Sequence, residues 1–157
     1  MPRKYESTEK FLRPDPRYGS KLVSRFINCI MSDGKKTTAQ SVVYEAFELL
    51  KKKIPEKEPI DAFTEAIEIV KPMVEVRSRR VGGATLQVPH EVRRNRQQSL
   101  AIRWILEGAR AKKGKPMARA LAEELFDAFN KQGSAFTKRE NTHKMAEANE
   151  AFAHFAW

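Results

Sequence analysis

The period of the apolar residues changes once along this chain, in residues 72–89, PMVEVRSRRVGGATLQVP. In the VEV and LQV triplets of this stretch, apolar and polar residues alternate as they do in a strand, whereas apolar residues on either side recur at helical spacing. Between the triplets, Gly82-Gly83 can adopt the positive φ angles that a two-residue hairpin turn needs. The stretch therefore predicts one β-hairpin at about residues 73–89.

Charge is unequal between the two predicted strands. The first strand carries Arg77, Arg79 and Arg80 with Glu75 as its acidic residue, and residues 84–89 carry no charge. Little within the hairpin is then expected to neutralise the three guanidiniums, so they require an external anion. Because an isolated two-stranded ribbon is marginally stable in water, we expect the hairpin to lean on helices and to become fully ordered against a partner.

Apolar residues at helical spacing predict six helices around the hairpin, with ends marked by proline, glycine and capping signals. The expected helices run from Ser20 to Asp33-Gly34, through a second segment that ends at Lys51-Lys52-Lys53, from Pro59 to Pro72, from Glu91 to Arg110, from Pro116 to Gly133, and from a capping box at Thr137 and Glu140 onward. The inward-facing residues expected in the last helix are Met145, Ala148, Phe152 and Phe155. The predicted fold is mainly α: a six-helix single domain with one β-hairpin protruding between the third and fourth helices.

The domain is expected to span residues 20–157. Residues 1–19 are basic, contain two prolines in LRPDPRYG and show no sustained period, which predicts an extended amino-terminal arm. A loose solvated tail is an equally open interpretation, because chain ends are often poorly ordered.

The formal net charge is +10, and the excess of Lys and Arg is concentrated in residues 1–36, 72–96 and 97–144. This distribution favours a polyanionic partner, with nucleic acid ahead of an anionic membrane. No run of apolar residues approaches the roughly 18 of a membrane span, and the amino terminus has no apolar signal core. We therefore expect a cytosolic protein without a membrane partner.

Basic residues also align along the fourth predicted helix. Arg96, Arg103 and Arg110 recur every seven residues, which places them on one stripe, and Arg93 lies near its upper end. The stripe continues the charge of the hairpin, which favours phosphate binding over a merely solvated face. Lys35-Lys36, beside the start of the second helix, are poorly placed for the helix dipole, and here too a phosphate contact is preferred to a solvated pair.

The sequence shows no set of residues for catalysis or metal binding. His90, His143 and His154 have no cluster of cysteines or carboxylates at metal-ligand spacing, and Gly82-Gly83 lack the frame of a nucleotide-binding loop. We therefore predict no enzyme activity, no cofactor, no metal site and no small-molecule substrate.

Two other groups of residues are given structural interpretations. Cys29 lies among the apolar residues of the first helix and is expected to be a buried small hydrophobe. Glu123-Glu124 and Asp127 are expected to form a solvated acidic face.

Two rival functions stay open on these patterns. A DNA-bending protein with β-arms is also small and basic, but such arms carry an apolar wedge at the tip, and Val81 and Ala84 make a weak one. An RNA-modifying enzyme would need a general base or a cofactor loop, and neither is evident in the sequence.

Three stretches resemble one known family. They are DPRYGSKLVSRFINCIMSDGKK at 15–36, VEVRSRRVGGATLQVPHEV at 74–92 together with the RW of 103–104, and NTHKMAEANEAFAH at 141–154. The resemblance is to the bacterial form of ribosomal protein seven of the small subunit, and it runs nearly from end to end. It implies a six-helix domain with a hairpin between the third and fourth helices.

The resemblance also implies a function and a set of partners. Residues 20–157 would be an rRNA-binding domain of a structural protein in the cytoplasmic ribosome, bound to the 3′ major domain of the 16S rRNA and nucleating assembly of the head. The protein would lie among neighbouring small-subunit ribosomal proteins and line the tRNA exit site and the mRNA exit channel, with exit-site tRNA and mRNA as partners.

Mapped on this chain, the resemblance assigns two groups of residues. The rRNA-binding group is Arg3, Lys4, Lys10, Lys35, Lys36, Arg77, Arg79, Arg80, Arg93, Arg94, Arg96, Arg103, Arg110, Lys112, Lys113 and Lys115. The group that would face tRNA or mRNA is Val81, Gly82, Gly83, Ala84, Lys138, Arg139, His143 and Lys144.

Overall fold

The structure, a computed structural model, describes residues 8–155, and Arg3 and Lys4 therefore lie outside the described residues. Its elements in chain order are the 3-10 helix η1 (Thr8–Phe11), α1 (Lys21–Ile30), α2 (Lys36–Lys53), α3 (Pro59–Val70), β1 (Val74–Val81), β2 (Ala84–Glu91), α4 (Arg94–Ala111), α5 (Met117–Phe129), α6 (Gly133–Ala148) and the 3-10 helix η2 (Glu150–Phe155). Over this range the predicted mainly α fold, with six α-helices and a hairpin between the third and fourth, is confirmed.

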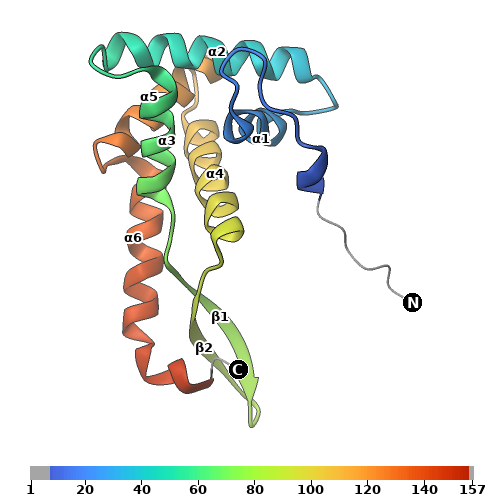
Figure 1. Ribbon diagram of the computed structural model, residues 1–157. Coiled ribbons are helices and arrows are strands. Elements are labelled where there is room, and N and C mark those ends of the chain that lie inside the picture. Colours follow the sequence, from blue (N-terminus) through green and yellow to red (C-terminus); the bar gives the residue numbers. More distant parts are fainter. Residues whose placement is uncertain (1–7, 156–157) are drawn as a thin grey trace.

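Helix α2 lies across one end of the molecule, and α3, α4 and α6 run from that end toward the hairpin, which projects at the other (Figure 1). Helix α5 packs against α2, α3, α4 and α6 and so occupies the centre of the bundle. None of the helices within residues 8–155 has the length and apolar character that crossing a membrane requires.

The core is built from aromatic and aliphatic side chains that the helical periods placed on one face of each helix. Phe26 of α1, Phe47 of α2 and Phe63 of α3 are fully buried, and the rings of Phe26 and Phe47 lie 5.0 and 5.1 Å from that of Phe63. Ring pairs at this spacing add to the free energy of apolar burial. Leu121 and Leu125 of α5 complete this core.

The chain just before α1 is fixed to α2. Asp15 is buried, its Oδ2 accepts hydrogen bonds of 3.1 Å from the backbone N–H groups of Arg17 and Tyr18, and its Oδ1 accepts one of 2.8 Å from the Tyr44 hydroxyl. Burial, followed by this hydrogen bond, raises the pKa of Tyr44 to about 12. The Tyr18 ring packs edge-on against Phe47, 5.3 Å away. Figure 1 shows η1 extending away from the bundle beyond this attachment.

Two predicted helix starts are wrong because tertiary contacts set them. The fourth helix begins at Arg94 and not at Glu91, which ends β2 opposite Val74. The sixth helix begins at Gly133, four residues before the predicted cap at Thr137. The hydroxyl of Thr137 instead donates to the carbonyl of Gly133, one turn back, so the predicted capping box is absent.

The predicted inner face of the sixth helix is also wrong in part. Met145 and Ala148 are exposed, and Ala146 is the buried residue of this turn. Phe152 and Phe155 are half-buried in η2, which turns back to contact β2. The reason is that this end of α6 lies beside a two-stranded ribbon, which offers a narrow surface to pack against.

A buried carboxylate joins α4, α5 and α6. Glu124 is 0% exposed, which corrects the expectation of a solvated acid, and its Oε1 accepts hydrogen bonds from the Ser134 hydroxyl at 2.8 Å and the Ala135 N–H at 3.0 Å. Lys112 Nζ lies 3.1 Å from Glu124 Oε2 and 3.0 Å from Asp127 Oδ2. A buried charge is tolerated when it is paired and hydrogen-bonded in this way.

This junction leaves no room for a side chain on the facing turn of α4. A Cβ added at Gly108 would lie 2.3 Å from Ser134 Oγ and 2.6 Å from Glu124 Oε1. The helices therefore approach as closely as they do because residue 108 has no side chain.

We predict that Gly108→Ala destabilises the protein. Alanine favours a helix by about 1 kcal/mol over glycine, but the forced shift of a buried, hydrogen-bonded carboxylate should outweigh this and leave a net loss of about 1–3 kcal/mol in the free energy of unfolding. Urea denaturation measures the loss. In a double-mutant cycle, Ser134→Ala removes the nearest clashing atom and should make the cost of Gly108→Ala smaller. A Gly108→Ala protein as stable as the parent would contradict this account.

Candidate nucleic-acid interface

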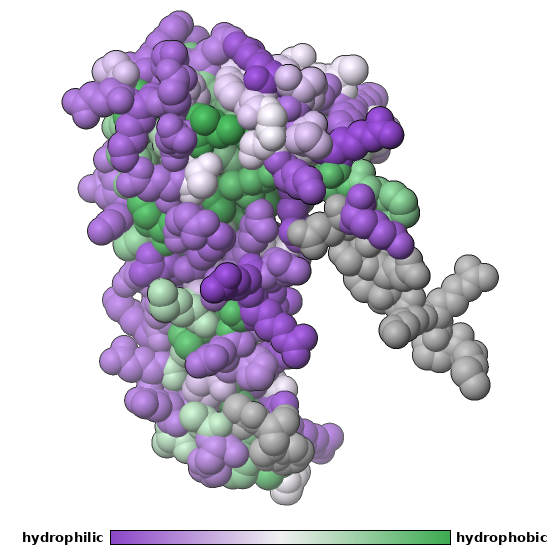
Figure 2. Space-filling view, in the orientation of Figure 1, coloured by the Kyte–Doolittle hydropathy of each residue, from purple (hydrophilic) through white to green (hydrophobic). Residues whose placement is uncertain are grey.

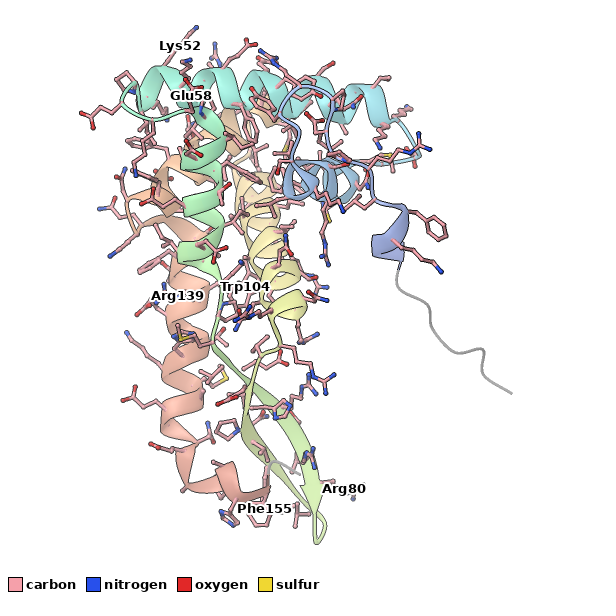
Figure 3. The ribbon with its side chains drawn as sticks, in the orientation of Figure 1. Lys52, Glu58, Arg80, Trp104, Arg139 and Phe155 are labelled. Atoms are coloured by element: carbon pink, nitrogen blue, oxygen red, sulfur yellow. The ribbon has the colours of Figure 1, made fainter. Side chains whose placement is uncertain are left out.

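The hairpin forms with the two-residue Gly82-Gly83 turn that the sequence predicts. Val81 pairs with Ala84 across a two-residue turn in which Gly82 and Gly83 have φ angles of 56° and 88°. Gly82, Gly83 and Ala84 are exposed, and Val81 is half-buried. Arg80 lies toward the tip of the ribbon (Figure 3).

A buried carboxylate fixes the base of the hairpin to α4. Glu75 is 7% exposed and accepts hydrogen bonds at 2.7 and 2.9 Å from Nε of Arg96. Arg77 donates to the same carboxylate through Nη2 at 2.8 Å and Nε at 3.1 Å. The expectation that little within the hairpin neutralises its arginines is therefore wrong for Arg77, and Arg96 of the predicted stripe is bound to the hairpin.

The protonation of Glu75 follows from this geometry. Burial alone would raise the pKa of the carboxyl, but the hydrogen bonds and positive charges of Arg96 and Arg77 outweigh burial and hold the pKa below its usual 4.5. The same hydrogen bond raises the pKa of Arg96. Glu75 is thus a permanent anion at neutral pH, and it neutralises part of the positive charge at the base of the ribbon.

Other arginines of the hairpin and of α4 stay available to an external anion. Within residues 8–155 no carboxylate forms an ion pair with the five exposed members of this group, which are Arg80, Arg93, Arg94, Arg103 and Arg110. Arg93 and Arg94 stand at the amino end of α4, whose first turn contains no acidic residue. Arg79, paired across the ribbon with Leu86, is half-buried.

Arg103 and Arg110 meet α1 at a surface cavity of about 410 Å³, which confirms that these two lie along one side of α4. The α1 side is lined by Arg25 and Cys29, neither of which was assigned to a site from the sequence. Arg25 donates to Ser99 Oγ at 2.8 Å and to Gln98 Oε1 at 3.5 Å. The sequence signal that could have found Arg25 and Cys29 is their spacing of one helical turn, because it places both on the same face of α1.

Cys29 is exposed at the wall of this cavity, so the prediction of a buried small hydrophobe is wrong. Partial desolvation raises the pKa of its thiol above the usual 9.0, against the opposing influence of the positive charges of Arg25 and Arg103. In the sequence, Cys29 lies between Ile27 and Ile30, which both face the core. These apolar neighbours made Cys29 look buried, although it lies at the edge of the helix face.

Some basic residues outside the hairpin and α4 are exposed, and others form ion pairs within the protein. Lys35 and Lys36 are exposed at the start of α2, which has no acidic residue in its first turn. Lys10 is exposed, with its Nζ 5.2 Å from the centre of the Phe11 ring. Lys113 is exposed in the loop after α4.

The same loop contains lysines that form ion pairs with carboxylates of the protein. Lys112 is half-buried in the Glu124 junction, where burial lowers the pKa of its ammonium but the hydrogen bonds from it to Asp127 and Glu124 raise the pKa overall. Lys115 forms an ion pair with Glu123, 2.7 Å away. Lys112 thus stabilises the fold, whereas Lys113 is exposed and forms no ion pair with a carboxylate of residues 8–155.

On α6, two of the residues assigned to tRNA or mRNA face the protein. Arg139 Nη1 donates to the carbonyl of Ile69 at the end of α3 at 2.6 Å, and Nε2 of His143 accepts a hydrogen bond of 3.1 Å from the Met73 N–H. Figure 3 shows Arg139 on the side of α6 that faces α3. Both contacts hold α6 against the junction where α3 passes into β1.

The other two assigned residues of α6 are exposed. Lys138 pairs with Glu107 of α4, and Lys144 is exposed on α6. Phe155 of η2 lies beside the ribbon (Figure 3), in agreement with the contact between η2 and β2. Figure 2 shows that most of the face in this view is hydrophilic, with apolar surface confined to small patches.

The described residues contain no group of three or more His, Cys, Asp and Glu side chains placed to hold a metal ion. The exposed arginines and lysines of this surface present guanidinium and ammonium groups on the hairpin and the helices. Such groups bind phosphates by charge and hydrogen bonding.

A family model described as ribosomal protein S7p/S5e matches residues 2–150. The chain belongs to the ribosomal protein S7p/S5e family. This confirms the resemblance seen in the sequence. Proteins of this ribosomal family are structural, which decides against an RNA-modifying enzyme and against a DNA-bending protein.

Curated relatives agree with this S7p/S5e membership over nearly the whole chain. The protein named small ribosomal subunit protein uS7 of Rhodopirellula baltica is 60% identical over 152 residues, which are 96% of this chain and 97% of that protein. The protein of the same name from Thermotoga neapolitana is 56% identical over 155 residues, 99% of each chain. The one from Nitratiruptor sp. is 61% identical over 144 residues, 92% of each chain.

We predict that His143 makes stability depend on pH in this S7p/S5e chain. Burial first, and then the charge of Arg139, lower the pKa of His143 below its usual 6.5, with Glu140 opposing them. The unfolded chain then binds a proton more readily than the folded one. The stabilisation from neutral His143 is complete above about pH 6.5 and declines as the pH falls toward the folded pKa.

The measurement is the free energy of unfolding at about pH 7.5 and 5.5. His143→Gln keeps an acceptor for the Met73 N–H and removes the titration, so its stability should fall less than that of the parent across this interval. His154→Gln, measured alongside, controls for loss of an exposed histidine. Equal slopes for the parent and His143→Gln would show that this histidine does not couple stability to pH.

Proposed function

We propose that this chain is a structural protein of the small ribosomal subunit that binds rRNA in the cytoplasmic ribosome. Its membership of a ribosomal protein family and its identity to relatives named small ribosomal subunit protein uS7 support the assignment. The observation on the molecule that carries it is the line of exposed arginines, without ion-pair partners in residues 8–155, from the hairpin along α4. The folded scaffold holds these cations at fixed positions, so that they neutralise phosphates that converge in folded RNA.

The starts of α2 and α4 support a phosphate contact over simple solvation. Both helices begin with cations, Lys35-Lys36 and Arg93-Arg94, and neither has an acidic residue in its first turn. A cation at the positive end of a helix dipole is unfavourable, whereas a phosphate there is attracted both by the dipole and by the cations. The arrangement is destabilising for the free protein and favourable for the complex.

The finer proposal concerns which RNA is bound and by which segments. The target is the 3′ major domain of the 16S rRNA, where the protein nucleates assembly of the head among neighbouring small-subunit proteins. Residues 20–157 are the rRNA-binding domain, and residues 1–19 are an arm whose root is fixed to α2 through Asp15. The contacts come from the exposed arginines of the ribbon and α4, Lys35-Lys36 and Lys113, while Arg77, Arg96 and Lys112 act first as ion-pair partners within the protein.

The tip of the hairpin and α6 are proposed to line the tRNA exit site and the mRNA exit channel. Support comes from the position of the tip, which projects beyond the ion pairs of Glu75 and exposes Gly82, Gly83 and Ala84. Lys138 and Lys144 are the exposed cations of α6 that fit this role. Arg139 and His143 contribute by holding α6 in place beside the ribbon.

Two arginine variants test whether α4 binds RNA or merely folds. Arg103→Gln should leave stability within about 0.5 kcal/mol of the parent, because its side chain is exposed and has no carboxylate partner among residues 8–155. Its affinity for a 3′ major-domain rRNA fragment should fall, and the slope of log K against log salt should become shallower by about 0.7–0.9. Arg96→Gln strips a hydrogen-bond partner from buried Glu75 and should cost about 1–3 kcal/mol of stability.

The parent slope itself tests the electrostatic account. Six or more neutralised phosphates give a slope steeper than about −4, and a slope shallower than about −2 would refute it. If Arg103→Gln lost stability and kept its RNA affinity at matched folded concentration, the exposed stripe would be structural and the proposed interface would be wrong.

A shortened hairpin tests the role of its tip. Deleting Val81 to Ala84 and closing the pair formed by Arg80 and Thr85 with Asn-Gly keeps the ribbon register and the Glu75 anchor. Small-subunit levels on a sucrose gradient should stay near normal, while a frameshift reporter in the same strain should show altered fidelity. Lost subunits would place the tip in the rRNA contact, and normal subunits with normal fidelity would make it a turn without a role at the exit site.

A further inference from the structure

The cavity between α1 and α4 has a chemistry that phosphate binding does not explain. Figure 1 shows α1 beside α4, and the two helices contact each other. Between them lies the surface cavity of about 410 Å³, which falls in the size range of about 300–1,000 Å³ typical of ligand pockets. The cations of Arg103 and Arg110 contribute to its lining from α4, and Arg25 does so from α1.

The lining also contains two apolar residues and one negative charge. Ile102 and Leu106 line it with side chains that are almost wholly buried in the bundle, and Glu107 contributes a carboxylate that also binds Lys138. A phosphate in the cavity would be attracted by the arginines but repelled by the carboxylate of Glu107. A flat group with N–H donors at its edge can pack on a guanidinium and donate to this carboxylate.

Arg25 adds a fixed planar surface. Its guanidinium is held by Ser99 Oγ at 2.8 Å and by Gln98 Oε1 at 3.5 Å, so it is positioned before any ligand arrives. Nucleobases stack on guanidinium planes, and unpaired bases are the usual targets of specific RNA recognition. Carboxylates accept hydrogen bonds from the exocyclic amino groups of bases.

We infer that this cavity takes one unpaired base of the bound rRNA, with the adjoining phosphates held by Arg103 and Arg110. The inference rests on the proposed rRNA-binding function and adds to it a subsite for a base among contacts to phosphate. The base packs beside Arg25 and presents an amino group to Glu107.

Cys29 provides a built-in reporter, because it lines the same cavity, is exposed and is the sole cysteine of the chain. The first experiment measures the rate of N-ethylmaleimide alkylation of Cys29 by mass spectrometry at low salt. An adenine RNA octamer should slow alkylation at least fivefold, whereas an abasic octamer with the same phosphates should give less than half of that protection. Equal protection by the two octamers, or none by either, would overturn the base subsite.

The second experiment fills the cavity in the full-length protein. Cys29 is converted to a mixed disulfide with a small neutral methylthio group or a large neutral benzylthio group, with the reaction run at alkaline pH because the thiol pKa is raised. The benzylthio form should bind the 3′ major-domain rRNA fragment at least tenfold more weakly, the methylthio form less than threefold more weakly, and dithiothreitol should restore both. Circular dichroism verifies that each adduct is folded.

A Cys29→Ser protein treated with the same reagents controls for modification elsewhere, and treatment must not change its affinity. If the benzylthio form binds the rRNA fragment as tightly as the parent, with the steep salt dependence intact, the subsite is refuted and the rRNA-binding function stands. If the unmodified protein fails to bind the fragment at all, both are refuted.

Discussion

The carboxylate of Glu75 fixes the direction in which the hairpin leaves the bundle. It is buried, and a buried anion is stable when charged hydrogen-bond donors surround it. Arg77 supplies such donors from the same strand. Arg96 supplies another from the first turn of α4, which follows the hairpin in the sequence. A backbone hydrogen bond from Val92 to the carbonyl of Met73 closes the base of the ribbon beside this cluster. The arginines nearer the tip are consequently presented at a fixed distance from the helices.

A ribbon of two strands has little surface of its own to bury, so the rest of the chain supports it. Helix α6 lies along β1, and η2 turns back onto β2. Arg139 and His143 hold α6 to the end of α3 and the start of β1. The family resemblance implied that both face tRNA or mRNA, yet each forms a hydrogen bond inside the protein. Lys112 likewise uses its charge inside the protein, in ion pairs with Glu124 and Asp127.

Basic residues of this surface therefore do two different jobs. Arg77, Arg96 and Lys112 neutralise carboxylates of the protein, and their loss is expected to appear first as lost stability. The exposed arginines at the tip, at the start of α4 and beside α1 form no such ion pair within residues 8–155. Their loss is expected to appear first as lower RNA affinity. Net charge alone does not distinguish the groups, since a paired and an unpaired guanidinium count equally in it.

The sequence by itself determined the elements that depend on local period and turn geometry. The alternation around Gly82-Gly83 predicted the hairpin and its two-residue turn, and helical spacing predicted six helices. Leu100, Ala101, Trp104 and Ile105 face inward on α4 as their spacing requires. Tertiary structure decided which individual polar groups are buried. Glu124 is buried while its neighbour Glu123 is not, and Cys29 is exposed. Helix α6 begins where Glu124 accepts hydrogen bonds from Ser134 and Ala135. The physical reason is range. Apolar period and φ preference act between residues a few positions apart, whereas Arg139 and Ile69, His143 and Met73, and Arg25 and Ser99 are about 70 positions apart and meet when the helices pack.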